Sequence, residues 1–221
     1  MQINPRSAAA LFGYLIFFSF AYVRLDAGSG ALILIGAVQL TMFSVAFHEG
    51  ERFTPLQWGG LGLALFGFIY LVSPGVSAPD PLGAAMMTVS GAAWGCFSLL
   101  ARGARDPVGE NAGNFLWCLL PAVIVSLLGV QKFTAMPVGL ILASVSGAVA
   151  TGFGYVVWYL ALRGLPAARA ATVQLSMPVL VALGGTVFLS EPLTVRLLIA
   201  SAAMLGGIAL VLGQRGESSS S

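Results

Sequence analysis

The fold is decided by residues 154–213, which read GYVVWYLALRGLPAARAATVQLSMPVLVALGGTVFLSEPLTVRLLIASAAMLGGIALVLG. Three apolar runs follow one another here. They are separated by a turn that carries Arg163 and Arg169 and by a shorter turn of Ser190, Glu191 and Pro192. A hydrocarbon core about 30 Å thick needs about 20 apolar helical residues to cross it. The first run is the end of an apolar segment that begins at 138, and the segments 138–162, 167–189 and 193–213 all come close to that length, so the stretch predicts three membrane-crossing helices.

An earlier copy of this stretch lies 140 residues upstream. The shift aligns identical residues in one ungapped register, which is typical of a diverged internal repeat. The aligned pairs are Ala21 with Ala161, Leu25 with Leu165, Ala27 with Ala167, Ala31 with Ala171, Glu51 with Glu191, Thr54 with Thr194 and Gly67 with Gly207.

The composition excludes an ordinary soluble domain. Of the 221 residues, 58% are hydrophobic and only 8% are charged, whereas soluble domains carry about 25% charged residues. The net charge of +2 comes from scattered basic residues, so nucleic acid is not an expected partner. Lipid is the expected solvent, and Cys96 and Cys118 are expected to pack inside apolar runs.

Hydropathy predicts an all-α integral membrane protein with about eight transmembrane helices. Helix is the open-ended structure that satisfies its own backbone polar groups in lipid. The expected helices are 8–23, 28–47, 56–73, 82–101, 112–130, 138–162, 167–189 and 193–213.

Loop charge predicts that both termini are cytoplasmic, because cytoplasmic loops carry the excess of Lys and Arg. In that orientation seven arginines lie inside, and Arg24, Lys132 and Arg196 lie outside. The polar tail 214–221 is expected to be a disordered cytoplasmic segment. A multi-pass protein of the bacterial inner membrane is the expected location.

The repeat places equivalent helices five crossings apart, so the second copy is inverted relative to the first. Inverted repeats are typical of secondary transporters, which hold substrate near the membrane midplane. We expect an incomplete first repeat of three helices at 1–74 and a second repeat of five helices at 75–213. Either the chain is a shortened form of a ten-helix protein, or it is a genuine eight-helix variant.

The quoted residues resemble the drug/metabolite transporter superfamily, specifically proteins built from tandem EamA domains. The resemblance rests on 154–196, on the weaker copy at 20–68, and on WGCFSLLAR at 94–102. It implies a gradient-driven carrier or exporter of a small organic metabolite, such as an amino acid. No single motif is specific, but their order, spacing and duplication are.

The carboxylates all fall at or beyond the ends of the expected helices. This argues against a proton or ion relay through a carboxylate at mid-membrane. Glu51 and Glu191 are related by the repeat, and each precedes a helix whose free amide groups it could cap. A gating contact is the alternative role for this pair.

Polar and aromatic side chains inside the apolar runs are the candidates for a substrate cavity. Amides at membrane depth either bond between helices or face a cavity, a proline frees a backbone carbonyl one turn earlier, and Tyr or Trp can also mark the interface. The candidates are Gln39, Trp94, Asn114, Tyr155, Tyr159, Gln174 and Pro178.

The sequence predicts neither an enzyme nor a cofactor or metal site. His48 is the sole histidine, and no phosphate-binding loop of the GxxxxGK[ST] type occurs. The partners expected are a small-molecule substrate and membrane lipid, and a homodimer is left open. The alternative to a transporter that works by alternating access is a non-transporting scaffold subunit or an inactive truncated product.

Overall fold

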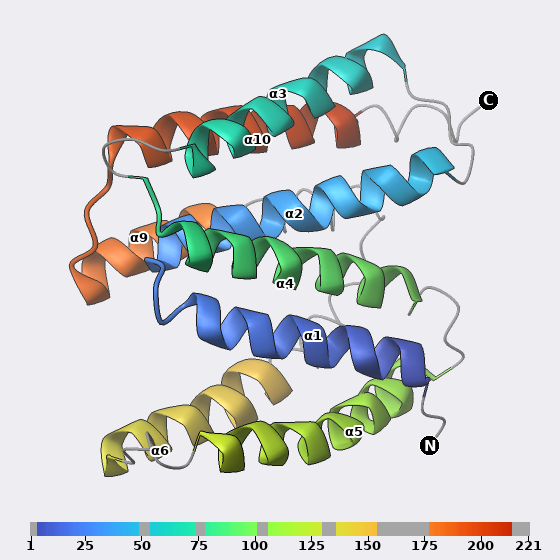
Figure 1. Ribbon diagram of the computed structural model, residues 1–221. Coiled ribbons are helices and arrows are strands. Elements are labelled where there is room, and N and C mark those ends of the chain that lie inside the picture. Colours follow the sequence, from blue (N-terminus) through green and yellow to red (C-terminus); the bar gives the residue numbers. More distant parts are fainter. Residues whose placement is uncertain are drawn as a thin grey trace.

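All regular structure in the described residues of the computed structural model is helical, in agreement with the predicted fold class (Figure 1). The structure describes residues 4–48, 54–73, 78–100, 106–129, 136–153 and 177–213. Their eight helical segments are α1 (Pro5–Ala21), α2 (Ala27–His48), α3 (Pro55–Val72), α4 (Pro81–Leu100), α5 (Pro107–Leu128), α6 (Pro137–Val145) continuing into η3 (Ser146–Phe153), α9 (Met177–Leu189) and α10 (Val195–Gly213).

Proline marks the first residue of five of these helices, where its missing N–H costs nothing. Side-chain caps precede several of them. Asn4 Oδ1 accepts from Arg6 N at 3.1 Å and Ser7 N at 3.4 Å, and Asp106 Oδ1 accepts from Gly109 N at 3.0 Å. These caps correct two predicted boundaries. The first helix begins at residue 5 rather than 8, and the fifth begins at 107 rather than 112.

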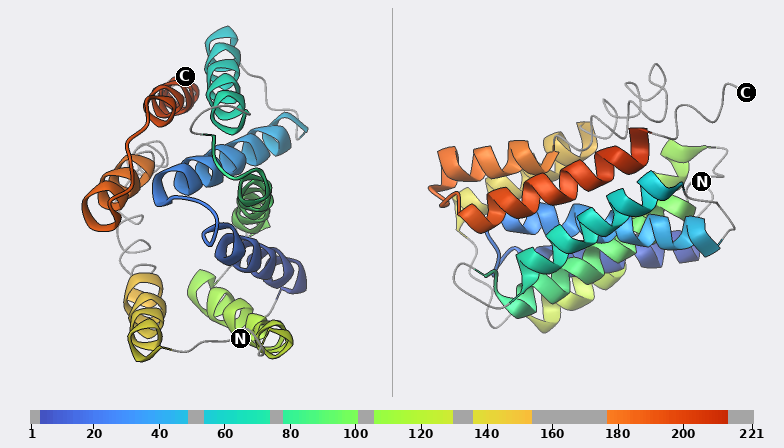
Figure 2. Two further views of the ribbon diagram at one scale, coloured as in Figure 1. Left: turned by 60° about the vertical axis from the view of Figure 1, so that its left-hand side comes forward. Right: turned by 90° about the horizontal axis from the view of Figure 1, so that it is seen from above.

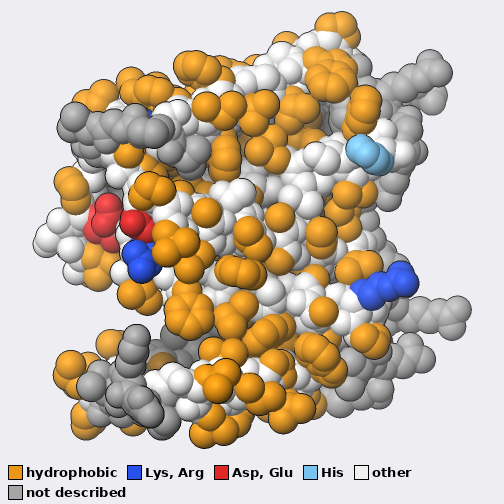
Figure 3. Space-filling view, viewed as in Figure 1, with side chains coloured by type: hydrophobic (Ala, Val, Ile, Leu, Met, Phe, Trp, Pro, Cys, Tyr) orange, Lys and Arg blue, Asp and Glu red, His pale blue; other side chains and the backbone are white. Residues whose placement is uncertain are grey.

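Three helices are long and apolar enough to cross a membrane by length and composition: 27–45 of α2, 81–100 of α4 and 109–128 of α5. The remaining apolar helices of the described chain are shorter. The predicted segments 138–162 and 167–189 are described only up to 153 and from 177. Hydrophobic side chains cover much of the face shown in Figure 3, as expected for a surface in contact with lipid.

Helix α2 is the centre of the bundle and contacts α3, α4, α9 and α10, while α1 packs between α4 and α5 (Figures 1 and 2). Small residues allow the closest approach. A Cβ on Gly91 of α4 would lie 2.6 Å from the Cβ of Ala37, and one on Gly95 would lie 3.0 Å from Cβ of Thr41. Gly91 and Gly95 therefore allow α4 to pack closely against α2.

Helices α3 and α10 form an antiparallel pair with an almost self-complementary crossing (Figure 1). A Cβ on Gly60 would lie 2.6 Å from the Gly207 carbonyl oxygen, and one on Gly67 would lie 3.0 Å from the Ala200 carbonyl oxygen. In the 140-residue register Gly60 corresponds to Ala200, and Gly67 corresponds to Gly207. Each copy therefore presents the same two positions to the other.

The helix starts of this pair also match in that register. Thr54 Oγ1 accepts from Gln57 N at 3.3 Å, and Thr194 Oγ1 accepts from Leu197 N at 3.1 Å. The side chain of Gln57 reaches the far end of α10, where Nε2 donates to Val211 O at 3.4 Å. These contacts support the predicted alignment of the two copies.

Candidate functional site

The best-defined polar contact between distant parts of the chain lies at the turn between α9 and α10. Ser190 adopts a left-handed backbone conformation with φ 56°, which is uncommon outside glycine. The following amide, Glu191 N, donates to Gly185 O at 3.1 Å. This tight turn brings the Glu191 side chain back toward the bundle.

The Glu191 carboxylate binds the N-terminus of α2, which is 164 residues away in the chain. Ala27 N donates to Oε1 at 2.8 Å and to Oε2 at 2.9 Å, and Gly28 N lies 3.5 Å from Oε2. The first amides of a helix have no acceptor within the helix and carry its positive dipole end. A carboxylate there satisfies both the hydrogen bonding and the charge.

Two glycines provide the space for this contact. A Cβ on Gly28 would lie 3.1 Å from the Cβ of Ala182, and a Cβ on Gly185 would collide with the Glu191 carboxylate. Larger residues would therefore separate α9 from α2. We call Ala27, Gly28, Ala182, Gly185 and Glu191 the Glu191 junction.

Tyr22, which follows α1, covers one side of the Glu191 junction. Its hydroxyl donates to Ala27 O at 3.4 Å, and a Cβ on Gly30 would lie 2.5 Å from its ring. Burial raises the pKa of the Tyr22 phenol, and the nearby charges of Tyr14 and Glu191 raise the pKa further. The phenol therefore stays protonated and able to donate.

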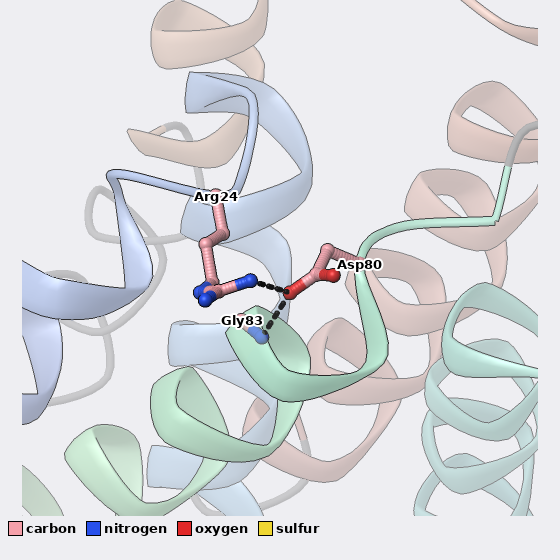
Figure 4. Close-up of polar contacts among 3 residues, drawn as sticks. All are labelled: Arg24, Asp80 and Gly83. Carbon is pink, nitrogen blue, oxygen red and sulfur yellow. Dashed lines mark hydrogen bonds and ion pairs between the residues drawn. The ribbon is translucent and has the colours of Figure 1, made fainter.

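The turn between α1 and α2 also binds the start of α4 (Figure 4). Asp80 Oδ1 accepts from Gly83 N at 2.7 Å and lies 3.7 Å from Nη1 of Arg24. The Arg24 and Asp80 side chains are 48% and 36% exposed, so this ion pair contributes little stability. The capping of α4 by Asp80 is its main structural effect.

A cavity of about 180 Å³ opens beside the Glu191 junction. Carboxylates of Asp26 and Glu191 and hydroxyls of Ser29, Thr186 and Thr194 line it, together with Leu197 and neighbouring apolar groups. No lysine or arginine is among the described residues that line it. In the described part of the chain, no group of three or more His, Cys, Asp or Glu side chains could hold a metal ion.

A second cavity of about 280 Å³ lies at the opposite end of α2, between α2 and α3. Its lining is mostly apolar and aromatic, and the rings of Phe47 and Trp58 meet edge to face at 5.8 Å. His48 Nδ1 lies 3.0 Å from Ser44 O at its rim. Such a lining offers little to orient a polar substrate.

The described candidate residues fall on different faces of the bundle. The Trp94 ring contacts that of Tyr14 of α1, with ring centroids 4.7 Å apart and the planes tilted by 51°. Asn114 is 1% exposed, and its Oδ1 has no partner among the described residues. Cys118, one turn further along α5, donates to Ala8 O at 3.6 Å. Trp94 and Asn114 thus both lie toward α1.

Gln39 is partly buried and lies elsewhere. Helical spacing puts it on the α2 face of Gly36, which packs against Met204 of α10 and Phe68 of α3. Pro178 is the second residue of α9 as described. Tyr155, Tyr159 and Gln174 lie outside the described residues. The structure therefore brings together only Trp94 and Asn114 of the described candidates.

One expectation for Glu191 is corrected. The sequence suggested that Glu191 caps the helix directly after it, but Thr194 caps α10 and Glu191 caps α2. Tyr22, Ala27 and Gly28 were not predicted to belong to a site. The only signal for them in the sequence was the turn composition around Asp26 and Gly28.

A helical bundle with an apolar surface, whose described charged side chains lie at the helix ends and turns, is typical of an integral membrane protein. The EamA-like transporter family matches residues 81–213, which is more than half of the chain. The chain belongs to the EamA-like transporter family, and hence to a class of membrane transporters.

Similar proteins agree with this assignment. An uncharacterized protein of Pseudomonas aeruginosa, PA1977, is 50% identical over 95% of this chain and 73% of its own length. An uncharacterized transporter of Archaeoglobus fulgidus is 29% identical over 94% of this chain and 77% of its own length. The inner membrane transporter YedA of Escherichia coli, also uncharacterized, is 30% identical over 61% of this chain and 40% of its own length. Of these relatives, YedA is named as an inner membrane protein, which agrees with a membrane location for this chain.

The fold has a counterpart among solved structures. One crystal structure superposes with a TM-score of 0.62 at 23% sequence identity, covering 96% of this chain and 77% of that protein. At this identity the similarity concerns the fold alone.

Proposed function

We propose that the chain is a gradient-driven carrier of a small organic metabolite that works by alternating access between two inverted repeats. The observation that carries this proposal is the α3–α10 crossing, where Gly60 approaches Gly207 and Gly67 approaches Ala200. Only a second copy turned over relative to the first gives an antiparallel pair with such reciprocal contacts. The halves at 1–74 and 75–213 are the units that would move.

The substrate path in this proposal runs between the halves. Gln39, Trp94, Asn114, Tyr155, Tyr159, Gln174 and Pro178 remain the proposed cavity residues. Among the described lining residues, the cavity beside Glu191 carries carboxylates and no lysine or arginine, which favours a neutral or cationic group over an anion at that end. We further propose that both termini are cytoplasmic, which makes the Glu191 junction part of the outer face.

Transport by purified protein in proteoliposomes tests the proposal. Vesicles with an imposed proton or sodium gradient are offered radiolabelled amino acids and small amines, with and without an ionophore. We expect uptake that depends on the gradient, stops with the ionophore and is unchanged by ATP. Protein that inserts fully and moves no candidate under any gradient would contradict the proposal.

A variant pair sharpens this test. Gln39→Ala removes an amide proposed to face the path, whereas Leu63→Ala changes an exposed side chain of α3. Uptake should fall for the first variant and persist for the second. Equal uptake by both variants would show that Gln39 does not line the substrate path. The carrier proposal itself would still be decided by the gradient experiment.

A further inference from the structure

We propose that Glu191 is a latch between the two halves of the transporter, and that its carboxylate must leave the α2 amides before the cavity beside it can open. This inference rests on the proposed function, because it assigns one contact to the closed state of a moving protein. Glu191 is a positioning residue here and is not proposed to bind substrate.

The contact joins the two halves directly. Ala27 and Gly28 belong to the first half, whereas Glu191, Gly185 and Ala182 belong to the second. A single side chain accepts two N–H groups across this boundary: Ala27 N donates to both carboxylate oxygens, at 2.8 and 2.9 Å, and Gly28 N lies 3.5 Å from Oε2. Hydrogen bonds to an ionised acceptor are about twice as strong as neutral ones.

Apart from Glu191, α9 meets α2 through small residues, with Ala182 packed against Gly28 and the neighbouring core. Among the α9 residues whose exposure is described, only Gly185 is buried, and Leu180, Val187, Phe188 and Leu189 are exposed. The α3–α10 pair is different, because glycine contacts run along its middle and side-chain hydrogen bonds tie both ends. A contact that depends on one carboxylate is easier to break than such a crossing.

The latch also borders solvent-accessible space. Ser29 and Thr186 line the cavity beside Glu191 from α2 and α9, one on each side of the junction. When the hydrogen bonds from Ala27 N and Gly28 N to the carboxylate break, α2 and α9 can separate and this cavity widens. The exposure of position 29 therefore reports the state of the latch.

Cysteine accessibility in detergent tests the latch without any substrate. Cys96 and Cys118 are first replaced by Ala, and Ser29→Cys becomes the reporter for a water-soluble maleimide. Adding Glu191→Gln keeps the size of the side chain but removes its charge and one acceptor oxygen. We expect labelling at position 29 to accelerate about tenfold, as expected from losing a charged hydrogen-bond acceptor.

Asp26→Asn is the matched control, because Asp26 lines the same cavity with an exposed side chain. It should leave the labelling rate within about twofold of the parent. Unchanged labelling in Glu191→Gln protein that remains monodisperse would overturn the proposal. So would equal acceleration by both variants, because general loss of negative charge would then explain the effect.

A disulfide lock keeps the idea testable if Glu191→Gln does not fold. Gly28→Cys and Ala182→Cys are combined, with Glu191 intact. Their Cβ atoms would lie 3.1 Å apart, just inside the usual disulfide separation of about 3.5–4.5 Å, so a shift of α9 by a few tenths of an ångström accommodates the bond. Oxidation should abolish transport, and reduction should restore it. Full transport by quantitatively cross-linked protein would overturn the latch, whereas absent transport before oxidation would count against the carrier proposal alone.

Discussion

At the scale of single residues, the guanidinium of Arg196 shows how a charge at a helix start can stabilise a neighbouring helix end. Arg196 lies in the first turn of α10. Its Nε donates to Tyr70 O at 3.1 Å and its Nη2 donates to Ser73 O at 2.6 Å, while the group lies 5.4 Å from the Tyr70 ring centroid. The carbonyl groups at the end of α3, which lack N–H donors from their own helix, thereby gain donors.

Arg196→Ala should lower the free energy of unfolding by about 1.5–3 kcal/mol, the range for hydrogen bonds to charged groups. Arg24→Ala is the control, because its ion pair with Asp80 is half exposed and spans 3.7 Å. That change should have an effect close to zero. Denaturant unfolding in micelles, followed by tryptophan fluorescence, measures both, and equal losses would contradict the assigned role.

Tyr22 makes the stability depend on alkaline pH. Its raised pKa means that the folded chain keeps the phenolic proton at a pH where the unfolded chain releases it. The free energy of unfolding should therefore be unaffected below about pH 10, the ordinary tyrosine value, and should fall above it. Tyr22→Phe should show a shallower fall in the unfolding midpoint between about pH 9 and 11, and parallel curves for the two proteins would contradict this.

Glu191 also shows what sequence can and cannot predict at this scale. Its capping chemistry was predictable from a carboxylate beside a turn. Its partner was not, because Ala27 lies 164 residues away and adjacency in sequence favours the following helix. The need for glycine at positions 28 and 185 is apparent only from the close contact between α2 and α9, which no local sequence pattern predicts.

At the scale of helices, the crossing of α3 and α10 depends on which glycines face the partner. Of the glycines that cluster on α3, Gly60 and Gly67 approach α10, whereas a Cβ on Gly59 or Gly62 would have nothing within 4 Å. Composition alone does not separate these two pairs of glycines. Helical periodicity explains the split, because positions 60 and 67 share one face.

Gly60→Ala should destabilise the protein by about 1–3 kcal/mol, because its methyl group would press on the backbone of α10. Gly62→Ala, on the same helix, should be neutral or stabilising by up to about 1 kcal/mol, since alanine favours helix. Thermal unfolding of the two variants compares them directly. Destabilisation by Gly62→Ala of equal size would show that the crossing is not the cause.

Helix starts were predicted less well than helix cores, for a physical reason. Apolar periodicity locates the buried or lipid-facing run, but the first turn of α5 contains Glu110 and precedes Asn111. Such residues appear as loop in a hydropathy scan. The cap at Asp106 followed by Pro107 was the signal that could have placed the start correctly.

At the scale of the whole molecule, the start of α1 and the end of α10 lie at the same end of the bundle (Figure 1). Reporter fusions at residues 1 and 221 should therefore fall on one side of the membrane. The arginine count favours the cytoplasm. Reporters active only in the periplasm should stay silent at both ends, and activity at one end only would contradict the predicted topology.

The overall class was predictable because composition and hydropathy act through the whole chain. A sequence with 58% hydrophobic and 8% charged residues has few alternatives to a membrane bundle. The inter-helix pairing was not predictable in the same way. Gly91 contacts Ala37, and Trp94 contacts Tyr14, through packing that no local pattern specifies.

The reciprocal contacts of α3 and α10 have an evolutionary consequence. This helix face can bind a second copy of itself in the antiparallel orientation. A half-length ancestor that inserted into the membrane in both orientations could therefore have formed a dimer through this face. Duplication and fusion would preserve that pairing without any new contact. Afterwards substitutions at positions 60 and 207 would be correlated, and so would those at positions 67 and 200. Among descendants, a larger side chain at one member of a couple should accompany a smaller one at the other.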